Sequence, residues 1–142
     1  MSEEPYESGI VKKDVFVKKR TITGEIVALT DLTLDSRGLQ LIAPRSRALL
    51  KNEIHELIIT DEMSASPGET VNNVIVVGFF EIKTGGIVVV GDTVTIGKIV
   101  IGEIAGFDVT HMPNHMNIVV KAEKRIRPEA VIGDEVTVTR PA

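Results

Sequence analysis

The residues of this chain best suited to chemistry lie in one short stretch, GFDVTHMPNHMN, at residues 106–117. It holds two imidazoles, two carboxamides and a carboxylate, carried by His111, His115, Asn114, Asn117 and Asp108. Such groups can bind metals, transfer protons or hydrogen-bond a polar ligand. The sequence therefore points first to this histidine loop as a functional site.

Two local geometries would bring the two histidines of the loop together. Pro113 and Asn114 suit the central positions of a type I turn, with His111 and His115 flanking the bend. Alternatively, Thr110 caps a single helical turn, and the spacing of four residues places both imidazoles on one face. Either geometry lets the two rings approach each other.

Four interpretations of the loop stay open. His111 and His115, completed by Asp108 or by His55, could hold a divalent transition metal such as zinc, iron or nickel. One histidine could act as a general base oriented by Asp108. The histidines, Asn114 and Asn117 could instead bind a small polar ligand. In the fourth interpretation the loop satisfies its own backbone and performs no chemistry.

Basic residues suggest what such a ligand would carry. Four of them crowd residues 35–51, namely Arg37, Arg45, Arg47 and Lys51. If this group faces the histidine loop, it suits a phosphate or a carboxylate. We therefore include Arg45 and Arg47 among the predicted ligand-binding residues.

The elements that must position these residues are predicted to be strands. Val and Ile number 19 and 17 against 8 Leu, and β-branched residues favour strands. Apolar runs such as residues 87–90 indicate burial on both faces. We expect one mainly β domain at residues 10–142, a partly open, mostly antiparallel β-barrel, preceded by a flexible segment at residues 1–9. A short helical insert is predicted near residues 35–50, where Leu39, Ile42 and Ala43 follow helical spacing.

His55 begins one of the predicted strands, next to Glu56. Neighbouring strand residues point to opposite faces, so the two side chains should not share a site without a bulge. A surface position at a strand edge is the more common place for such a histidine. Whether His55 reaches the other two histidines depends on long-range strand pairing.

One sequence pattern occurs twice. Residues 88–96, VVVGDTVTI, match residues 130–138, AVIGDEVTV, 42 positions later. Gly tolerates positive φ and Asp hydrogen-bonds nearby backbone, so Gly-Asp suits a tight turn. The simpler interpretation is one turn type used twice, and the alternative is a shared ancestral hairpin.

Composition excludes several functions. The absence of Cys removes disulfides, thiolate metal sites and cysteine nucleophiles, and a net charge of −4 argues against nucleic-acid binding. No apolar run is long enough to span a bilayer and the chain start lacks a signal-peptide core, so we expect a cytoplasmic protein without a membrane partner. No Walker, Rossmann, His-Glu-x-x-His or Gly-x-Ser-x-Gly motif occurs. The Val and Ile excess favours an exposed apolar edge and therefore a homodimer.

The segment from Gly85 to Val120, with its GFDVTHMPNHMN run, resembles an uncharacterised prokaryotic family of unknown function that carries a GFDxTHxPNHxN motif. The resemblance covers most of the chain from about Gly24. It implies no activity.

The order of elements is more distantly similar to the glucitol/sorbitol-specific IIA component of the sugar phosphotransferase system. Gly91-Asp92, Gly106 and residues 111–119 fall at comparable places. That resemblance implies a partly open β-barrel. The family's candidate phospho-acceptor histidine would lie near residues 77–80, where this chain has none.

These observations favour binding of a small polar or phosphorylated metabolite by the histidine loop. A metal-dependent enzyme using His111, His115 and Asp108 is one alternative, and a structural homodimer without loop chemistry is another. No residue pattern assigns a catalytic role or a reaction.

Overall fold

The computed structural model describes residues 20–141, which form twelve β-strands and no helix. The strands are β1 (Ile22–Leu29), β2 (Thr33–Leu34), β3 (Leu39–Gln40), β4 (Ser46–Leu49), β5 (Ile54–Thr60), β6 (Thr70–Val71), β7 (Val74–Thr84), β8 (Gly86–Val89), β9 (Thr93–Ile96), β10 (Ile99–Asp108), β11 (Asn117–Lys121) and β12 (Glu135–Thr139). The prediction of a mainly β protein is confirmed. The segment predicted to be flexible, residues 1–9, and the first part of the predicted domain, residues 10–19, lie outside the described residues.

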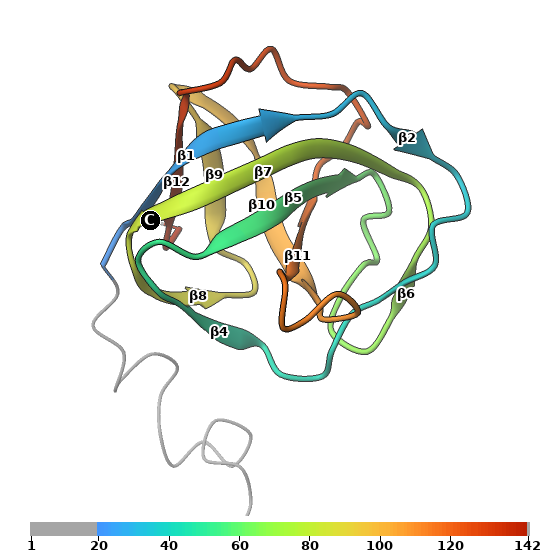
Figure 1. Ribbon diagram of the computed structural model, residues 1–142. Coiled ribbons are helices and arrows are strands. Elements are labelled where there is room, and N and C mark those ends of the chain that lie inside the picture. The colour runs from blue at the N-terminus through green and yellow to red at the C-terminus, as the bar shows by residue number, and fades with distance from the viewer. Residues whose placement is uncertain (1–19, 142) are drawn as a thin grey trace, which may run out of the picture.

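Seven strands pair in a closed ring, in the order β1-β12-β9-β10-β11-β5-β7 and back to β1. Figure 1 shows β1, β7 and β5 side by side and β12 and β9 together at the left of the view. Every pairing in the ring is antiparallel except that of β11 with β5. No helix of the described chain is long and apolar enough to cross a membrane.

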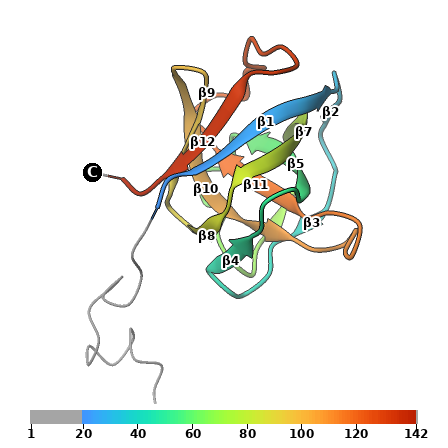
Figure 2. The same ribbon diagram turned by 60° about the vertical axis from the view of Figure 1, so that its left-hand side comes forward.

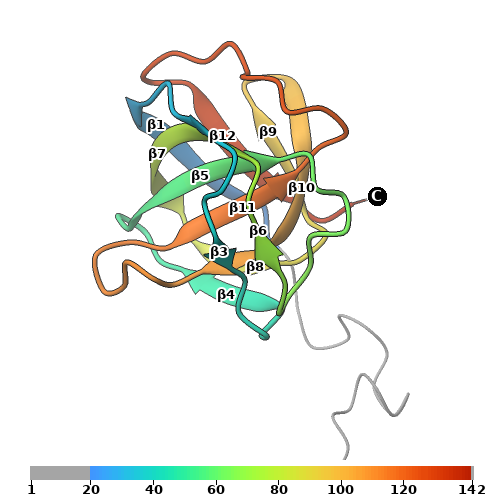
Figure 3. The same cartoon turned by 90° about the vertical axis from the view of Figure 1, so that its right-hand side faces the viewer.

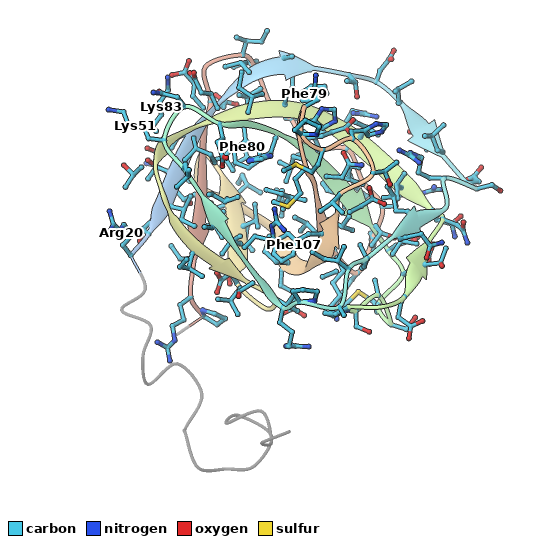
Figure 4. All side chains as sticks on the ribbon, turned by 60° about the horizontal axis from the view of Figure 1, so that its bottom comes forward. Arg20, Lys51, Phe79, Phe80, Lys83 and Phe107 are labelled. Carbon is cyan, nitrogen blue, oxygen red and sulfur yellow. The ribbon has the colours of Figure 1, made fainter. Side chains whose placement is uncertain are left out.

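The main core fills the inside of this ring. Along β1 buried and half-buried residues alternate, as expected for a strand with one face inward. Phe80 of β7 and Phe107 of β10 are fully buried there. Figure 4 shows both phenyl groups enclosed by the paired strands. Burial of each such side chain stabilises the fold by about 1.5–3 kcal/mol.

A second, smaller core covers part of the outside of the ring. Residues 30–73, between β1 and β7, contribute β5 to the ring and place β3 and β6 outside it, where these two short strands pair with each other. Figure 3 shows this pair in front of β11. Leu39 and Val71 pack there against Val119 of β11 and Ala105 of β10. The outer face of β10, β11 and β5 is therefore partly closed off from solvent, and the histidine loop lies at its margin.

The predicted helical insert at residues 35–50 is wrong. Gly38 adopts a positive φ of 70°, β3 follows, and β4 pairs with β8. Leu39 and Leu41 are both buried whereas Ala43 is exposed, so burial follows the two-residue period of a strand and not the helical spacing. Pairing with β6 and β8, which are distant in sequence, decides the conformation of this segment.

The repeated Gly-Asp motif forms the same turn twice. Gly91 and Gly133 have φ angles of 97° and 99°. In each turn the Asp carboxylate, of Asp92 or Asp134, accepts a hydrogen bond of 2.9 Å from the amide three residues earlier. The prediction that Gly-Asp forms a tight turn at both places is confirmed.

The repetition extends to the strands beside the two turns. Gly91 donates to the carbonyl of Ile104, and Gly133 donates to that of Ile26, both at 2.8 Å. Ile104 and Ile26 in turn donate to the Asp carbonyls of the two turns. The pairing of β1 with β7 also corresponds to that of β10 with β11. Both β1 and β10 contain a bulge, between Ile26 and Ala28 and between Ile104 and Gly106. These contacts relate β1, β7 and β9 to β10, β11 and β12.

An approximate two-fold axis relates the two halves. Thr95 of β9 and Thr137 of β12 are equivalent residues, and they pair directly with each other. In the first half, residues 30–73 connect the first strand to the second, and in the second half the histidine loop makes that connection. The histidine loop is therefore the short counterpart of the long segment that carries β2 to β6.

Candidate functional site

Four side chains line up across the outer face of four neighbouring strands. Strand register pairs Phe79 of β7 with Glu56 of β5, Glu56 with Asn117 of β11, and Asn117 with Asp108 of β10. Their strand neighbours Phe80, Phe107 and Ile118 belong to the inner core, so these four face outward. The row forms the floor on which the histidine loop rests.

The loop at residues 109–116 makes a tight turn above this floor. The amide of Asn114 donates to the carbonyl of His111 at 2.9 Å, and the Met112–Pro113 peptide is cis. Pro113 therefore occupies the third position of the turn rather than the second position of a type I turn. A turn is confirmed, and the single helical turn is not formed.

Asp108 connects the start of the histidine loop to β3 and β11. Its carboxylate accepts hydrogen bonds from the amide of Thr110 at 2.9 Å, the amide of Gln40 at 2.8 Å and the side-chain amide of Asn117 at 3.3 Å. Burial favours the neutral acid. The amides of Thr110 and Gln40, the Thr110 hydroxyl and the charge of Arg37 together outweigh burial and lower the pKa of Asp108. Asp108 is thus occupied with holding backbone, and it does not orient a histidine.

The two loop histidines lie against each other. Their ring centroids are 5.1 Å apart and the planes are tilted by 30°. The His115 ring also meets Phe79 edge-on, at 5.1 Å and 85°. Nδ1 of His115 lies 2.7 Å from Oδ1 of Asn114, and because that oxygen only accepts, Nδ1 carries a proton. Asn114, rather than Asp108, therefore orients His115.

Beneath the loop, the floor keeps acceptor atoms without a hydrogen-bond donor. Nε2 of His115 lies 3.5 Å from the Glu56 carboxylate, close enough for an ion pair, yet it makes no hydrogen bond. Oδ1 of Asn117 is buried and has no hydrogen-bond partner either. A donor or a proton placed here would meet several acceptors at once.

Arg37 approaches the loop from the segment before β3. Its Nη2 lies 3.4 Å from Nε2 of His111. A guanidinium only donates, so Nε2 of His111 acts as the acceptor. Arg37 is half-buried, and it makes no ion pair with any carboxylate in residues 20–141.

His55 lies apart from this site. It is buried, its Nδ1 accepts a hydrogen bond from the Met116 amide at 3.1 Å, and its Nε2 lies 3.2 Å from Glu53. Burial raises the pKa of Glu53, but the Leu50 amide, His55 and Arg47 together lower it below its usual value. The prediction that His55 and Glu56 face opposite ways is confirmed, whereas His55 is buried rather than on the surface. His55 supports the end of the loop through Met116.

The structure separates the other predicted residues as well. His111, His115, Asn114, Asn117 and Asp108 gather at one place, as the sequence suggested. Arg45 lies in the exposed turn before β4, and Arg47 lies in β4, where its charge acts on Glu53. Within the described residues no three His, Asp or Glu side chains converge in a way that could hold a metal ion.

Sequence reasoning did not select Arg37, Glu56 and Phe79 as site residues. The sequence marks Arg37 only as one member of a basic group, and Glu56 only as the neighbour of His55. Phe79 sits inside a long apolar run and carries no signal of its own. Strand register, which pairs residues distant in sequence, is what brings the last two to the site.

Comparison with known proteins supports the resemblance to an uncharacterised family and goes no further. The comparisons with curated proteins and with solved structures gave no match. The GFDxTHxPNHxN motif as a family feature and the similarity to the sugar phosphotransferase component stay predictions. A family model matches residues 16–139, which include both halves of the ring and the histidine loop, and the chain therefore belongs to the family of unknown function DUF6917.

Proposed function

We propose that this protein binds a small polar metabolite through an anionic group, a phosphate or a carboxylate, held by Arg37 and the histidine loop. The observation that carries the proposal is the position of Arg37. Arg37 is a half-buried residue whose guanidinium lies 3.4 Å from Nε2 of His111, and no carboxylate of the described chain forms an ion pair with it. The charge of Arg37 acts on Asp108, but the oxygen atoms of that carboxylate accept hydrogen bonds from the amides of Thr110 and Gln40. Within the described residues Arg37 therefore keeps N–H donors for an external anion.

The neighbouring groups suit such a ligand. Arg37 offers five N–H donors in a planar fork, of which His111 uses one. Oxygen atoms of a phosphate or carboxylate match the remaining fork geometry. Asn114 and the His111 ring, both exposed on the loop, would hydrogen-bond the rest of a polar ligand. The site therefore combines one charge contact with several adjustable polar contacts.

The experiment is calorimetric titration of the full chain with inorganic phosphate, glucose 6-phosphate and citrate as separate probes. We expect at least one probe to bind, and Arg37→Ala to weaken that binding at least tenfold, about 1.4 kcal/mol. Arg37→Lys should bind more weakly than the original protein, because an ammonium cannot form the two-pronged contact.

Arg45→Ala provides the matched control. Arg45 belongs to the same basic group in the sequence as Arg37, but it is exposed and lies just before β4. Equal weakening by the Arg45 and Arg37 substitutions would contradict the assignment to Arg37. Failure of all three anions to bind, together with tight binding of zinc or nickel that His115→Ala abolishes, would instead favour a metal site.

A further inference from the structure

The two-fold relation between the halves reveals a corner that is covered in one half and open in the other. In the first half, β8 leads into the Gly91 turn and pairs with β4. Val90, just before the turn, is 9% exposed, and Ile22, which pairs with Val138 of β12, is fully buried. The chain thus covers this corner with one of its own strands.

The equivalent corner of the second half is exposed. Val131 and Ile132 precede the Gly133 turn, and each is 63% exposed. Ile99 pairs with Ile96, the counterpart of Val138, and is 67% exposed, while its neighbour Val100 is 63% exposed. In the described part of the chain no strand pairs with residues 128–132.

These four apolar residues lie on two neighbouring segments. The hairpin between β9 and β10 is tied to the start of β12, because the amide of Gly97 donates to the carbonyl of Glu135 at 2.8 Å. Figure 2 shows the hairpin and the turn before β12 near each other at the top of the molecule. We refer to Ile99, Val100, Val131 and Ile132 together as the open corner. Contiguous exposed apolar residues of this kind mark interaction surfaces.

We propose that the open corner is the interface through which two copies of this chain associate. The covered corner shows what this surface accepts, an extended strand lying beside the segment before the turn. In a two-fold dimer, residues 128–132 of the two copies would run antiparallel to each other, and each apolar set would cover the other.

The charges around the open corner are compatible with such a dimer. Lys98 lies at the tip of the hairpin, and Glu129 and Glu135 flank the turn, and all three are exposed. Because both signs occur on one rim, a two-fold arrangement exists in which the lysine of one copy faces the acidic residues of the other. An interface that displayed a single sign would repel its own copy instead.

The test is sedimentation equilibrium of the full chain over a hundredfold range of concentration. We expect a reversible dimer, and we expect Ile132→Glu and Val100→Glu each to raise its dissociation constant at least tenfold. Leu50→Glu is the matched control, since Leu50 is 62% exposed but lies in the turn between β4 and β5. It should leave the dissociation constant unchanged.

Charge reversal adds a test that a folding defect cannot mimic. Lys98→Glu should weaken the dimer, and combining it with Glu129→Lys should restore at least part of the affinity. A monomer at every concentration would overturn the proposal. A dimer that Leu50→Glu weakens as much as Ile132→Glu does would overturn it as well.

Discussion

At the scale of single residues, Asp108 connects the fold to the candidate site. One carboxylate binds the amide of Thr110 at the start of the histidine loop and the amide of Gln40 in β3. Arg37 is three residues before Gln40 and reaches His111. Asp108 therefore sets the position of the loop and of the arginine together, although it contacts neither histidine in the described hydrogen bonds. The sequence predicts Asp108 as a ligand or as the group that orients a histidine base, and in the structure its carboxylate holds backbone amides.

The lowered pKa of Asp108 makes acid stability a direct test of this role. Because the pKa is lower in the folded state, the ionised carboxylate stabilises the fold above its unfolded pKa of about 4. That contribution is lost as the pH falls through the lower folded value. We expect Asp108→Asn to cost about 1–3 kcal/mol at pH 7 and to reduce the loss of stability below pH 4.

Urea unfolding of the two proteins at several pH values between 2.5 and 7, roughly the range over which a carboxylate titrates, measures both effects. Asp31→Asn, which changes an exposed Asp, is the control and should alter neither quantity. Equal slopes of stability against pH for the original protein and Asp108→Asn would contradict the role assigned to this carboxylate.

At the scale of elements, alternation and turn chemistry predict the strands and Gly-Asp turns well, because both depend on neighbours in sequence. The helix predicted around Leu39 failed because pairing with β6 overrides the local pattern. The site shows the same division. The loop residues from Asp108 to Asn117 are close in sequence and could be found together. Glu56 and Phe79 join them only through strand register, which no local pattern encodes.

Another element held by distant contacts is the segment between β11 and β12. Arg127 donates to the carbonyls of Thr30, Val76 and Leu32 at 2.7–2.8 Å. It thereby ties this segment to the chain between β1 and β2 and to β7. Without the guanidinium, each carbonyl would lose one donor, although that of Val76 would keep the Thr30 hydroxyl and that of Leu32 would keep the Val76 amide.

We therefore expect Arg127→Ala to lower the free energy of unfolding by about 2–3 kcal/mol, since hydrogen bonds from a charged donor contribute more than neutral ones. Arg127→Lys should recover only part of this, because an ammonium cannot reproduce the planar geometry. Lys124→Ala, an exposed cation of the same segment, should cost less than about 0.5 kcal/mol. Urea denaturation followed by circular dichroism gives all three values. Equal effects of the Arg127 and Lys124 substitutions would contradict the stabilising role assigned to Arg127.

At the scale of the whole molecule, the two halves use one framework for different purposes. Each half has a bulged first strand, a second strand, a Gly-Asp turn and a last strand. The first half inserts residues 30–73, which build the outer core and supply Arg37 and Glu56. The second half inserts only the histidine loop. The candidate site lies where these two equivalent insertions meet, so its residues come from both halves.

The equivalence of the two turns predicts matched energetic effects. Gly91 and Gly133 have nearly equal positive φ angles, and a Cβ atom added at either would meet nothing within 4 Å. Only backbone strain then opposes Ala, about 1–2 kcal/mol for a residue with a side chain in this conformation. Gly91→Ala and Gly133→Ala should therefore destabilise the protein by similar amounts, and the two changes should add in the double variant because the turns share no contact.

Gly78→Ala separates the cost of a strained backbone conformation from the cost of a steric collision. Its φ of 153° is also positive, but an added Cβ would collide with the Ala28 carbonyl. This substitution should cost clearly more than either turn variant, since backbone of β1 must move to make room. Thermal and urea unfolding of the four variants give the comparison. A difference of more than about 1.5 kcal/mol between Gly91→Ala and Gly133→Ala would mean that the two halves, despite their common geometry, do not share equivalent turns energetically.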